Sequence, residues 1–145
     1  MFKTILFPTD GSALSEKIIP TAIDFATLTG AKIIAIYVVQ PLPFPTVTDG
    51  GINIDAGIYE QQMNEAAQHH LNKIGDEARA AKIPFESVVV QSVNPYEEIV
   101  KTAAQAHCDI ILMASHGRKG LNKLFLGSET QKVLAHTTLP VMVLR

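Results

Sequence analysis

Short runs of consecutive apolar residues alternate along the chain with longer segments whose apolar residues recur every three or four positions. The short runs lie at residues 3–8, 31–39, 85–90, 109–114 and 140–144. Runs that are apolar at every position suit strands covered on both faces, whereas a sheet with one solvated face shows strict alternation. The pattern therefore predicts a parallel sheet of five strands connected by helices.

The first two helical segments carry clear apolar stripes. Within residues 12–30, Pro20 removes the hydrogen bond to the Glu16 carbonyl, so we expect a kink or a helix in two parts, with Gly30 as its stop. The second helix lies within residues 57–82. Its stripe consists of Met63, Ala67, His70, Leu71, Ile74, Ala78 and Ala81.

The last two helices have recognisable start signals. Asn94 can cap the third helix, Pro95 suits its first position, and Glu97 can reach back to the cap. At the start of the fourth helix, Ser128 can cap and Gln131 can reach back in the same way. These signals predict helix starts at residues 94–95 and 128.

This order of elements predicts one α/β domain over residues 1–145, an open doubly wound sheet of five parallel strands with helices on both faces. Such sheets bind ligands beyond the carboxyl ends of their strands, where the strand order reverses. The sequence alone leaves the strand order open. The connection at residues 40–57 is unusually long and holds three prolines, which suits either a lid over a ligand or a disordered, partner-binding loop.

Composition narrows the possible partners. The chain has 145 residues, of which 47% are hydrophobic, and a formal charge of −2, so no overall basic field attracts nucleic acid or anionic lipid. No apolar stretch approaches the roughly 20 residues that span a bilayer. We therefore expect a soluble cytoplasmic protein that binds neither nucleic acid nor membrane. The single Cys108 is expected to be a buried, reduced thiol.

One strand-to-helix connection combines features of an anion site. Residues 114–128 read ASHGRKGLNKLFLGS, with three glycines ahead of a helix start. Glycine permits positive φ and close approach, and backbone N–H groups at a helix start can converge on phosphate. Arg118, Lys119 and Lys123 add positive charge, although a solvated loop would contain the same residues. The Ser128 side chain either caps the helix or contacts a phosphate oxygen, or the Ser128 backbone N–H contacts phosphate while the hydroxyl caps.

A second candidate lies in the first turn, FPTDGS, at residues 7–12. Asp10 can accept from a ribose hydroxyl or lie near a phosphate-bound divalent cation; alternatively, Asp10 or Ser12 only caps the following helix. His116 is placed where chemistry could occur, but no orienting carboxylate is near it in sequence. A phosphate contact or a plain loop role is therefore favoured over general-base catalysis.

The other histidines give weaker signals. His70 lies on the apolar stripe of its helix and is expected to be a core or interface residue with a satisfied hydrogen bond. His69, His107 and His136 show no spacing typical of metal ligands.

The PTDGS turn, the YVV at residues 37–39, and an SHG followed nine residues later by GS together resemble the universal stress proteins over essentially the whole chain. Nucleotide-binding members carry glycine, two residues, glycine, nine residues, then glycine and serine or threonine. Here Gly117 and Gly127-Ser128 match, while Ala114 replaces the first glycine. Its methyl group could crowd the nucleotide or forbid a backbone angle that glycine adopts, but the rest of the pattern favours binding.

The resemblance implies an adenine-nucleotide alpha hydrolase-like fold that binds ATP with Mg²⁺ between the two glycine-bearing loops. Asp10 would lie near the metal through the phosphates. The implied nucleotide-binding residues are Pro8, Thr9, Asp10, Val38, Met113, Ala114, Ser115, His116, Gly117, Arg118, Gly127, Ser128 and Glu129. For Val38 and Met113, ordinary strand core is an equally good interpretation. The resemblance also implies a homodimer formed through Val141, Met142, Val143 and Leu144.

Two functions remain open on these grounds. The first is an ATP-binding stress-response module that works as a dimeric switch, and the second is a nucleotide-free dimeric scaffold that keeps the glycine loop for packing. No Walker lysine-serine pair or clear water-positioning residue is present, so no catalytic residue is assigned and any ATP hydrolysis should be slow.

Overall fold

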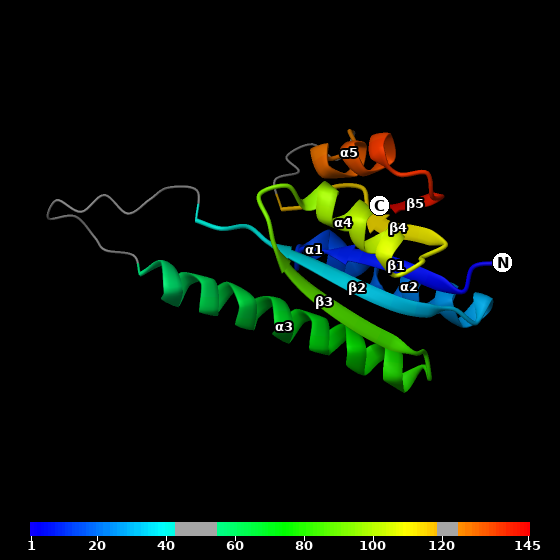
Figure 1. The fold of residues 1–145 in the computed structure, drawn as a ribbon. Helices are drawn as coiled ribbons and strands as arrows, with labels where there is room; N and C mark the ends of the chain where they lie inside the picture. The colour runs from blue at the N-terminus through cyan, green and yellow to red at the C-terminus, as the bar shows by residue number, and fades with distance from the viewer. Residues whose placement is uncertain (43–54, 119–124) are drawn as a thin grey trace, which may run out of the picture.

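Five parallel strands form the centre of the molecule in a computed structural model that describes residues 1–42, 55–118 and 125–145. The strands are β1 (Thr4–Thr9), β2 (Lys32–Val39), β3 (Phe85–Gln91), β4 (Ile110–Ala114) and β5 (Val141–Leu144). Their order across the sheet is β3-β2-β1-β4-β5 (Figure 1). The predicted α/β fold with a five-stranded parallel sheet is confirmed.

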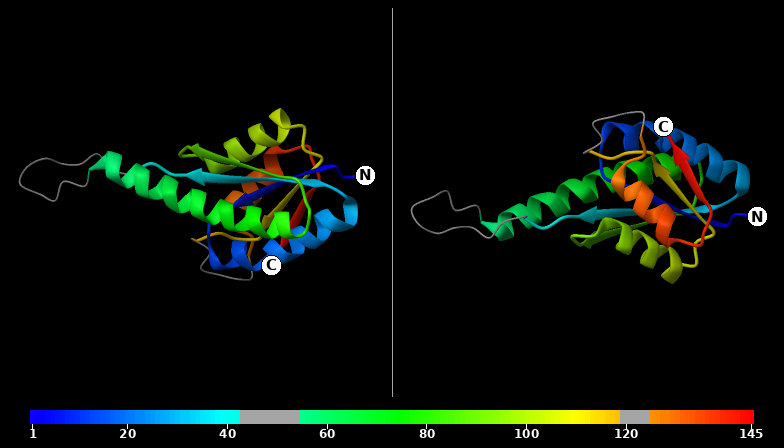
Figure 2. Two further views of the ribbon diagram at one scale, coloured as in Figure 1. Left: turned by 90° about the horizontal axis from the view of Figure 1, so that it is seen from below. Right: turned by 90° about the horizontal axis from the view of Figure 1, so that it is seen from above.

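Helices cover both faces of the sheet. They are α1 (Ala13–Lys17), α2 (Ile19–Thr29), α3 (Ala56–Ala80), α4 (Pro95–Gln105) and α5 (Ser128–His136). The helices α2 and α3 lie on one face, whereas α4 and α5 lie on the other (Figure 2). Among the described helices, none combines the length and apolarity that crossing a membrane would need.

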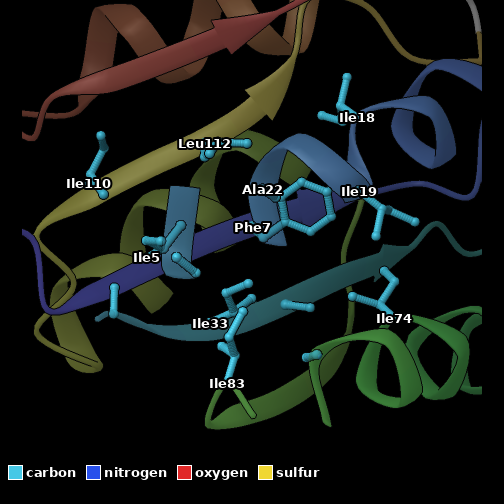
Figure 3. Packing of buried hydrophobic residues seen from close by; sticks show 14 of the residues in the cluster. Ile5, Phe7, Ile18, Ile19, Ala22, Ile33, Ile74, Ile83, Ile110 and Leu112 are labelled. Carbon is cyan, nitrogen blue, oxygen red and sulfur yellow. The ribbon is translucent and has the colours of Figure 1, made fainter. Parts of the chain in front are cut away.

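Each face of the sheet has its own apolar core. Alternate residues of β1 point to opposite faces, so Ile5 and Phe7 pack beneath α2 and α3, while Leu6 packs toward α4 and α5. Figure 3 shows the first of these clusters, in which Ile33 of β2 and Ile74 of α3 also lie. Burial on both faces explains why the strands are apolar at consecutive positions.

The predicted break near Pro20 is confirmed. The short α1 begins after Ser12, whose side chain accepts a hydrogen bond from the Ser15 N–H at 3.2 Å. A new helix, α2, then starts beside Pro20. N–H groups in the first turn make no hydrogen bond within the helix, so a proline there, which lacks the N–H, breaks none. Gly30 ends α2 with a φ of 68°, a left-handed conformation that glycine adopts easily.

The predicted helix starts are confirmed, because α4 begins at Pro95 with Asn94 as its N-cap residue and α5 begins at Ser128, but the predicted side-chain caps are wrong. The Asn94 side chain makes no capping hydrogen bond, and the Tyr96 N–H in the first turn of α4 donates instead to Glu129 of α5 at 2.9 Å. At α5 the N-cap is Gly127, and the Gln131 side chain donates to the Leu126 carbonyl at 2.7 Å. The neighbouring helix α5 therefore supplies the acceptor for the first turn of α4, and the loop before α5 supplies the acceptor for the Gln131 side chain.

The strand order places a switch point beside the central strand. β1 lies between β2 and β4, so the winding of the chain reverses between β1 and β4. Their ladder joins Ile5 to Ile110 and Leu6 to Ile111, nearer the amino-terminal ends of the two strands. The loops that follow β1 and β4 therefore meet at one edge of the sheet. Most of the long 40–57 connection, together with Lys119, Gly120 and Lys123, lies outside the described residues.

Candidate functional site

A cavity of about 400 Å³ lies at the carboxyl ends of β1, β2 and β4. Side chains from both faces of the sheet line it, together with the β4–α5 loop and the start of α5. The predicted nucleotide-site residues that border this cavity are Pro8, Thr9, Asp10, Val38, Met113, Ala114, His116, Gly117, Arg118, Gly127, Ser128 and Glu129. The fold thus brings together residues from three distant parts of the sequence, and only Ser115 of the predicted set is missing from the lining.

Asp10 joins the two loops that frame the cavity. Its Oδ1 atom accepts from the Ser12 N–H at 2.9 Å, and its Oδ2 atom accepts from the Arg118 N–H at 3.0 Å. Burial acts to raise the pKa of Asp10, but the hydrogen bonds from Ser12 and Arg118 outweigh it and hold the pKa below its usual value. The carboxylate is therefore ionised at neutral pH and fixes the position of the β4 loop.

Tyr37 belongs to this site although it was absent from the predicted set. Its hydroxyl donates to the Asp10 carbonyl at 2.9 Å and accepts from Arg118 Nη2 at 3.3 Å. Burial raises the pKa of Tyr37, so the hydroxyl keeps its proton and remains a donor. Tyr37 directly precedes the predicted Val38 and pairs with Thr9 in the sheet, a relation that only the strand register reveals.

The two described glycines of the loop are needed for close approach. Neither Gly117 nor Gly127 has a φ in the left-handed region, so of the two properties that glycine offers, close approach rather than positive φ is the one used here. A Cβ atom at Gly117 would overlap Asp10 Oδ2, and one at Gly127 would lie 3.0 Å from the Cα atom of His116. Glycine lets the loop backbone pack directly against the Asp10 carboxylate and against itself.

The base of the β4–α5 loop is pinned by backbone hydrogen bonds. The Gly127 N–H donates to the Ser115 carbonyl at 2.7 Å, and the Ser115 N–H donates to the Leu144 carbonyl of β5, also at 2.7 Å. Thr130 adds a hydrogen bond from its hydroxyl to the Ala114 carbonyl at 3.0 Å. Ser115 is consequently 4% exposed and supports the loop from below, which corrects the prediction that it lines the site.

Ala114 fits the backbone at the position of the first motif glycine. It is the last residue of β4, pairs with Leu144 of β5, and does not have a positive φ. Ala114 therefore occupies this position without a backbone angle that only glycine adopts. Its side chain packs against the core beneath α2 and α3 as well as bordering the cavity.

The amino-terminal end of α5 borders the cavity and offers backbone donors. The first N–H groups of a helix have no partners within the helix, and the helix dipole makes this end favourable for anions. The Glu129 carboxylate is engaged by the Tyr96 N–H of α4, so its backbone N–H, together with that of Ser128, is the part suited to an anion.

The two histidines near the cavity differ in their partners. His116 borders the cavity, and its Nδ1 atom lies 3.1 Å from the Ser115 hydroxyl; among the described residues no carboxylate pairs with its ring. His70 is buried, and its Nε2 atom lies 2.7 Å from the Thr9 hydroxyl. The prediction that His70 is a core residue with a satisfied hydrogen bond is confirmed.

An apolar wall closes the side of the cavity toward α4. Val38 and Met113 belong to the core beneath α4 and α5, which confirms their interpretation as strand core, and they also border the cavity. Ile36 and Ile99 extend the same wall and were not predicted. Ile36 lies two positions before Val38 on the same face of β2, a signal that strand periodicity offered.

Comparisons with known proteins agree on one family. The model of the universal stress protein family matches residues 1–145. Universal stress protein MJ0577 of Methanocaldococcus jannaschii is 29% identical over all of this chain and 96% of its own, and its structure aligns with a TM-score of 0.84 over 99% of this chain.

Two further solved structures share the fold at lower identity. A universal stress protein in complex with cAMP aligns with a TM-score of 0.67 and 22% identity, covering 99% of this chain and 97% of its own. The universal stress protein from Archaeoglobus fulgidus in complex with dAMP aligns with a TM-score of 0.64 and 14% identity, covering 100% of this chain and 98% of its own.

Proposed function

The chain belongs to the universal stress protein family, and we propose that it is a module that binds ATP with Mg²⁺ and acts as a dimeric switch in a stress response. The observation that carries the proposal is the single cavity in which the β1 turn, the end of β4 and the start of α5 converge. Structural neighbours solved with cAMP and dAMP support the choice of an adenine nucleotide as the ligand.

The phosphates would lie against the β4–α5 loop and the start of α5. Gly117 and Gly127 lack side chains where the backbone must come close, and Ser128 and Glu129, whose N–H groups belong to the first turn of α5, border the cavity. The guanidinium of Arg118 adds a positive charge beside this cradle, and no carboxylate of the described residues forms an ion pair with it. A polyanion therefore finds both backbone donors and a cation here.

The nucleoside would occupy the remaining part of the cavity. The apolar wall that contains Val38 and Met113 suits a planar base, and Pro8 adds a further apolar lining residue. Asp10 borders the same cavity and can accept from ribose hydroxyls. Ala114 has a methyl group and a strand conformation, so it narrows the cavity slightly without disturbing the loop.

The residues present fit a phosphate-bound Mg²⁺ better than a protein-held one. No group of three or more histidine, cysteine or carboxylate side chains that could hold a metal occurs among the described residues. Asp10 is an ionised carboxylate whose oxygens retain acceptor capacity beyond their two hydrogen bonds. Mg²⁺ is commonly held by one or two carboxylates together with substrate phosphates, and it would here offset phosphate charge near Asp10.

Dimerisation is proposed through β5. This four-residue strand lies at the edge of the sheet and pairs with β4 on one side. All four of its residues, Val141, Met142, Val143 and Leu144, are half-buried, and an apolar strand edge invites pairing with a second copy. Replacing Val143 by Pro should yield monomers in light scattering, whereas Val143→Ala should leave the dimer intact. A Val143→Pro variant that stays dimeric refutes this interface.

The first test of nucleotide binding uses freshly purified protein. Denaturation followed by chromatography should release adenine nucleotide, or calorimetry should show ATP binding with a micromolar Kd in the presence of Mg²⁺. Asp10→Ala should weaken that binding about tenfold or more, because it removes the acceptor for ribose hydroxyls and the carboxylate that holds the Arg118 N–H and would lie near Mg²⁺. No release, and no binding at millimolar ATP, would leave the nucleotide-free dimeric scaffold as the function.

A further inference from the structure

A buried hydrogen bond connects the cavity wall to α3 and has no role in the proposed nucleotide site. Thr9 of β1 and His70 of α3 are 6% and 7% exposed, and the Thr9 hydroxyl lies 2.7 Å from His70 Nε2. Thr9 lines the cavity and directly precedes Asp10, which joins the two site loops. His70 itself lies behind this wall and does not border the cavity.

The charged groups around His70 determine whether its imidazole is protonated and which ring nitrogen carries the hydrogen. Glu16 of α1 places Oε1 3.7 Å from His70 Nδ1, and Lys73 of α3 lies 3.8 Å from the same oxygen. The Tyr37 ring of β2 lies edge-on with its centre 6.1 Å from the imidazole centre, and the charges of Asp10 and Arg118 act on the imidazole from the cavity rim.

Burial lowers the pKa of His70 and Glu16 opposes that shift, so the imidazole is neutral at neutral pH. Glu16 favours the N–H on Nδ1, which leaves Nε2 as the acceptor of the Thr9 hydroxyl proton. In this state the Thr9 oxygen can only accept further hydrogen bonds.

Protonation of His70 reverses the direction of this hydrogen bond. Nε2 then carries a hydrogen and donates to the Thr9 oxygen, which frees the hydroxyl hydrogen of Thr9 to donate elsewhere. A positive charge also arises one side chain away from the cavity. Both changes favour a ligand that carries hydrogen-bond acceptors and negative charge.

We propose that His70 is a positioning residue for anion binding in this cavity, which acts through the Thr9 hydroxyl and takes up a proton when a phosphate-bearing ligand binds. The inference rests on the proposed nucleotide site. Coupling between two binding events is reciprocal, so a ligand that favours protonated His70 is itself bound more tightly when His70 is protonated. The protein would thereby bind nucleotide more tightly as the pH falls.

Proton uptake on binding is the decisive measurement. Calorimetry of ATP binding with Mg²⁺ at pH 6, in buffers of different ionisation enthalpy, gives the number of protons taken up. Wild type should take up more protons than His70→Gln, because glutamine does not titrate. His69→Gln is the matched control, since His69 is the exposed neighbour on the same helix, and it should behave as wild type. Between pH 7.5 and 5.5, affinity should rise about fivefold more in wild type than in His70→Gln.

A second measurement needs no substitution. Proton NMR of the imidazole should show His70 titrating below the usual value of about 6.5 in the free protein, and at a higher pH when ATP is bound. A His70 titration that does not move on binding, or equal proton uptake in wild type and His70→Gln, overturns this inference and leaves nucleotide binding standing. No ATP binding at any pH overturns both proposals.

Replacing Thr9 tests the route through its hydroxyl. Thr9→Ser keeps the hydroxyl and should retain the excess proton uptake, whereas Thr9→Val, which has a similar shape, should reduce it. Equal uptake in these two variants would show that His70 acts by its charge alone and would overturn the role of Thr9.

Discussion

Replacing Gly117 by Ala tests why the β4 loop carries a glycine. The new Cβ would overlap Asp10 Oδ2, which also accepts the hydrogen bond from the Arg118 N–H. Relieving the overlap must break or lengthen this bond, and a hydrogen bond to a charged group contributes about 1.5–3 kcal/mol. Alanine also restricts the conformations of the unfolded chain, which stabilises the folded state by about 0.4–1 kcal/mol. We therefore expect Gly117→Ala to lower the free energy of unfolding by about 1–2 kcal/mol.

Urea denaturation with linear extrapolation measures this loss, and an Asp10→Ala background provides the control. Without the carboxylate the overlap disappears, so adding Gly117→Ala should be neutral or slightly stabilising in that background. Because the effect of alanine on the unfolded chain cancels in the double-mutant cycle, the coupling energy between the two positions should be about 1.5–3 kcal/mol. An equal loss in both backgrounds would show that the glycine is required for another reason and would refute the close-approach argument.

Three other predictions concern single side chains. Ala114→Gly should leave ATP affinity within about threefold, as calorimetry can measure, because Ala114 already has a strand conformation; a large gain would show that its methyl group blocks the site. Burial raises the pKa of the Cys108 thiol to about 11, so iodoacetamide at pH 8 should label it only in urea, and rapid labelling of the folded protein would contradict its burial. Because His70 has a lowered pKa in the folded state, the unfolded chain binds more protons, and the free energy of unfolding should fall as the pH drops below about 6.5. This fall should be smaller in His70→Gln when urea denaturation is repeated from pH 7.5 to 5.

Much of the candidate site was visible in the sequence because its parts follow strands. Asp10 lies just after an apolar run, and Gly117 and Gly127 punctuate a strand-to-helix connection, so their types and positions suggested an anion site. The hydrogen bonds of Tyr37 with Asp10 and of Thr9 with His70 could not be predicted from the sequence. Their partners are 27 and 61 residues away in sequence, and no local pattern reports such contacts.

Local chemistry also misled where tertiary partners were better placed. Asn94 has the side chain of a helix cap, yet Glu129 from α5 receives the N–H of the first turn of α4. The loop glycines were compatible with either positive φ or close approach, and the tertiary contacts with Asp10 and His116 show that close approach is what requires them. A side chain offers several hydrogen-bonding options, and the arrangement of neighbouring elements selects among them.

By itself the sequence determined the kinds of elements and their order along the chain. Apolar runs covered on both faces must be strands of a buried parallel sheet, and a proline inside a helical segment must interrupt the hydrogen bonds of the helix. Only the tertiary structure decided the strand order, the meeting of the β1 and β4 loops, and the burial of His70 against Thr9. These features depend on contacts between residues far apart in the chain. Hydrophobic periodicity shows which residues are buried but does not indicate which distant residues come into contact.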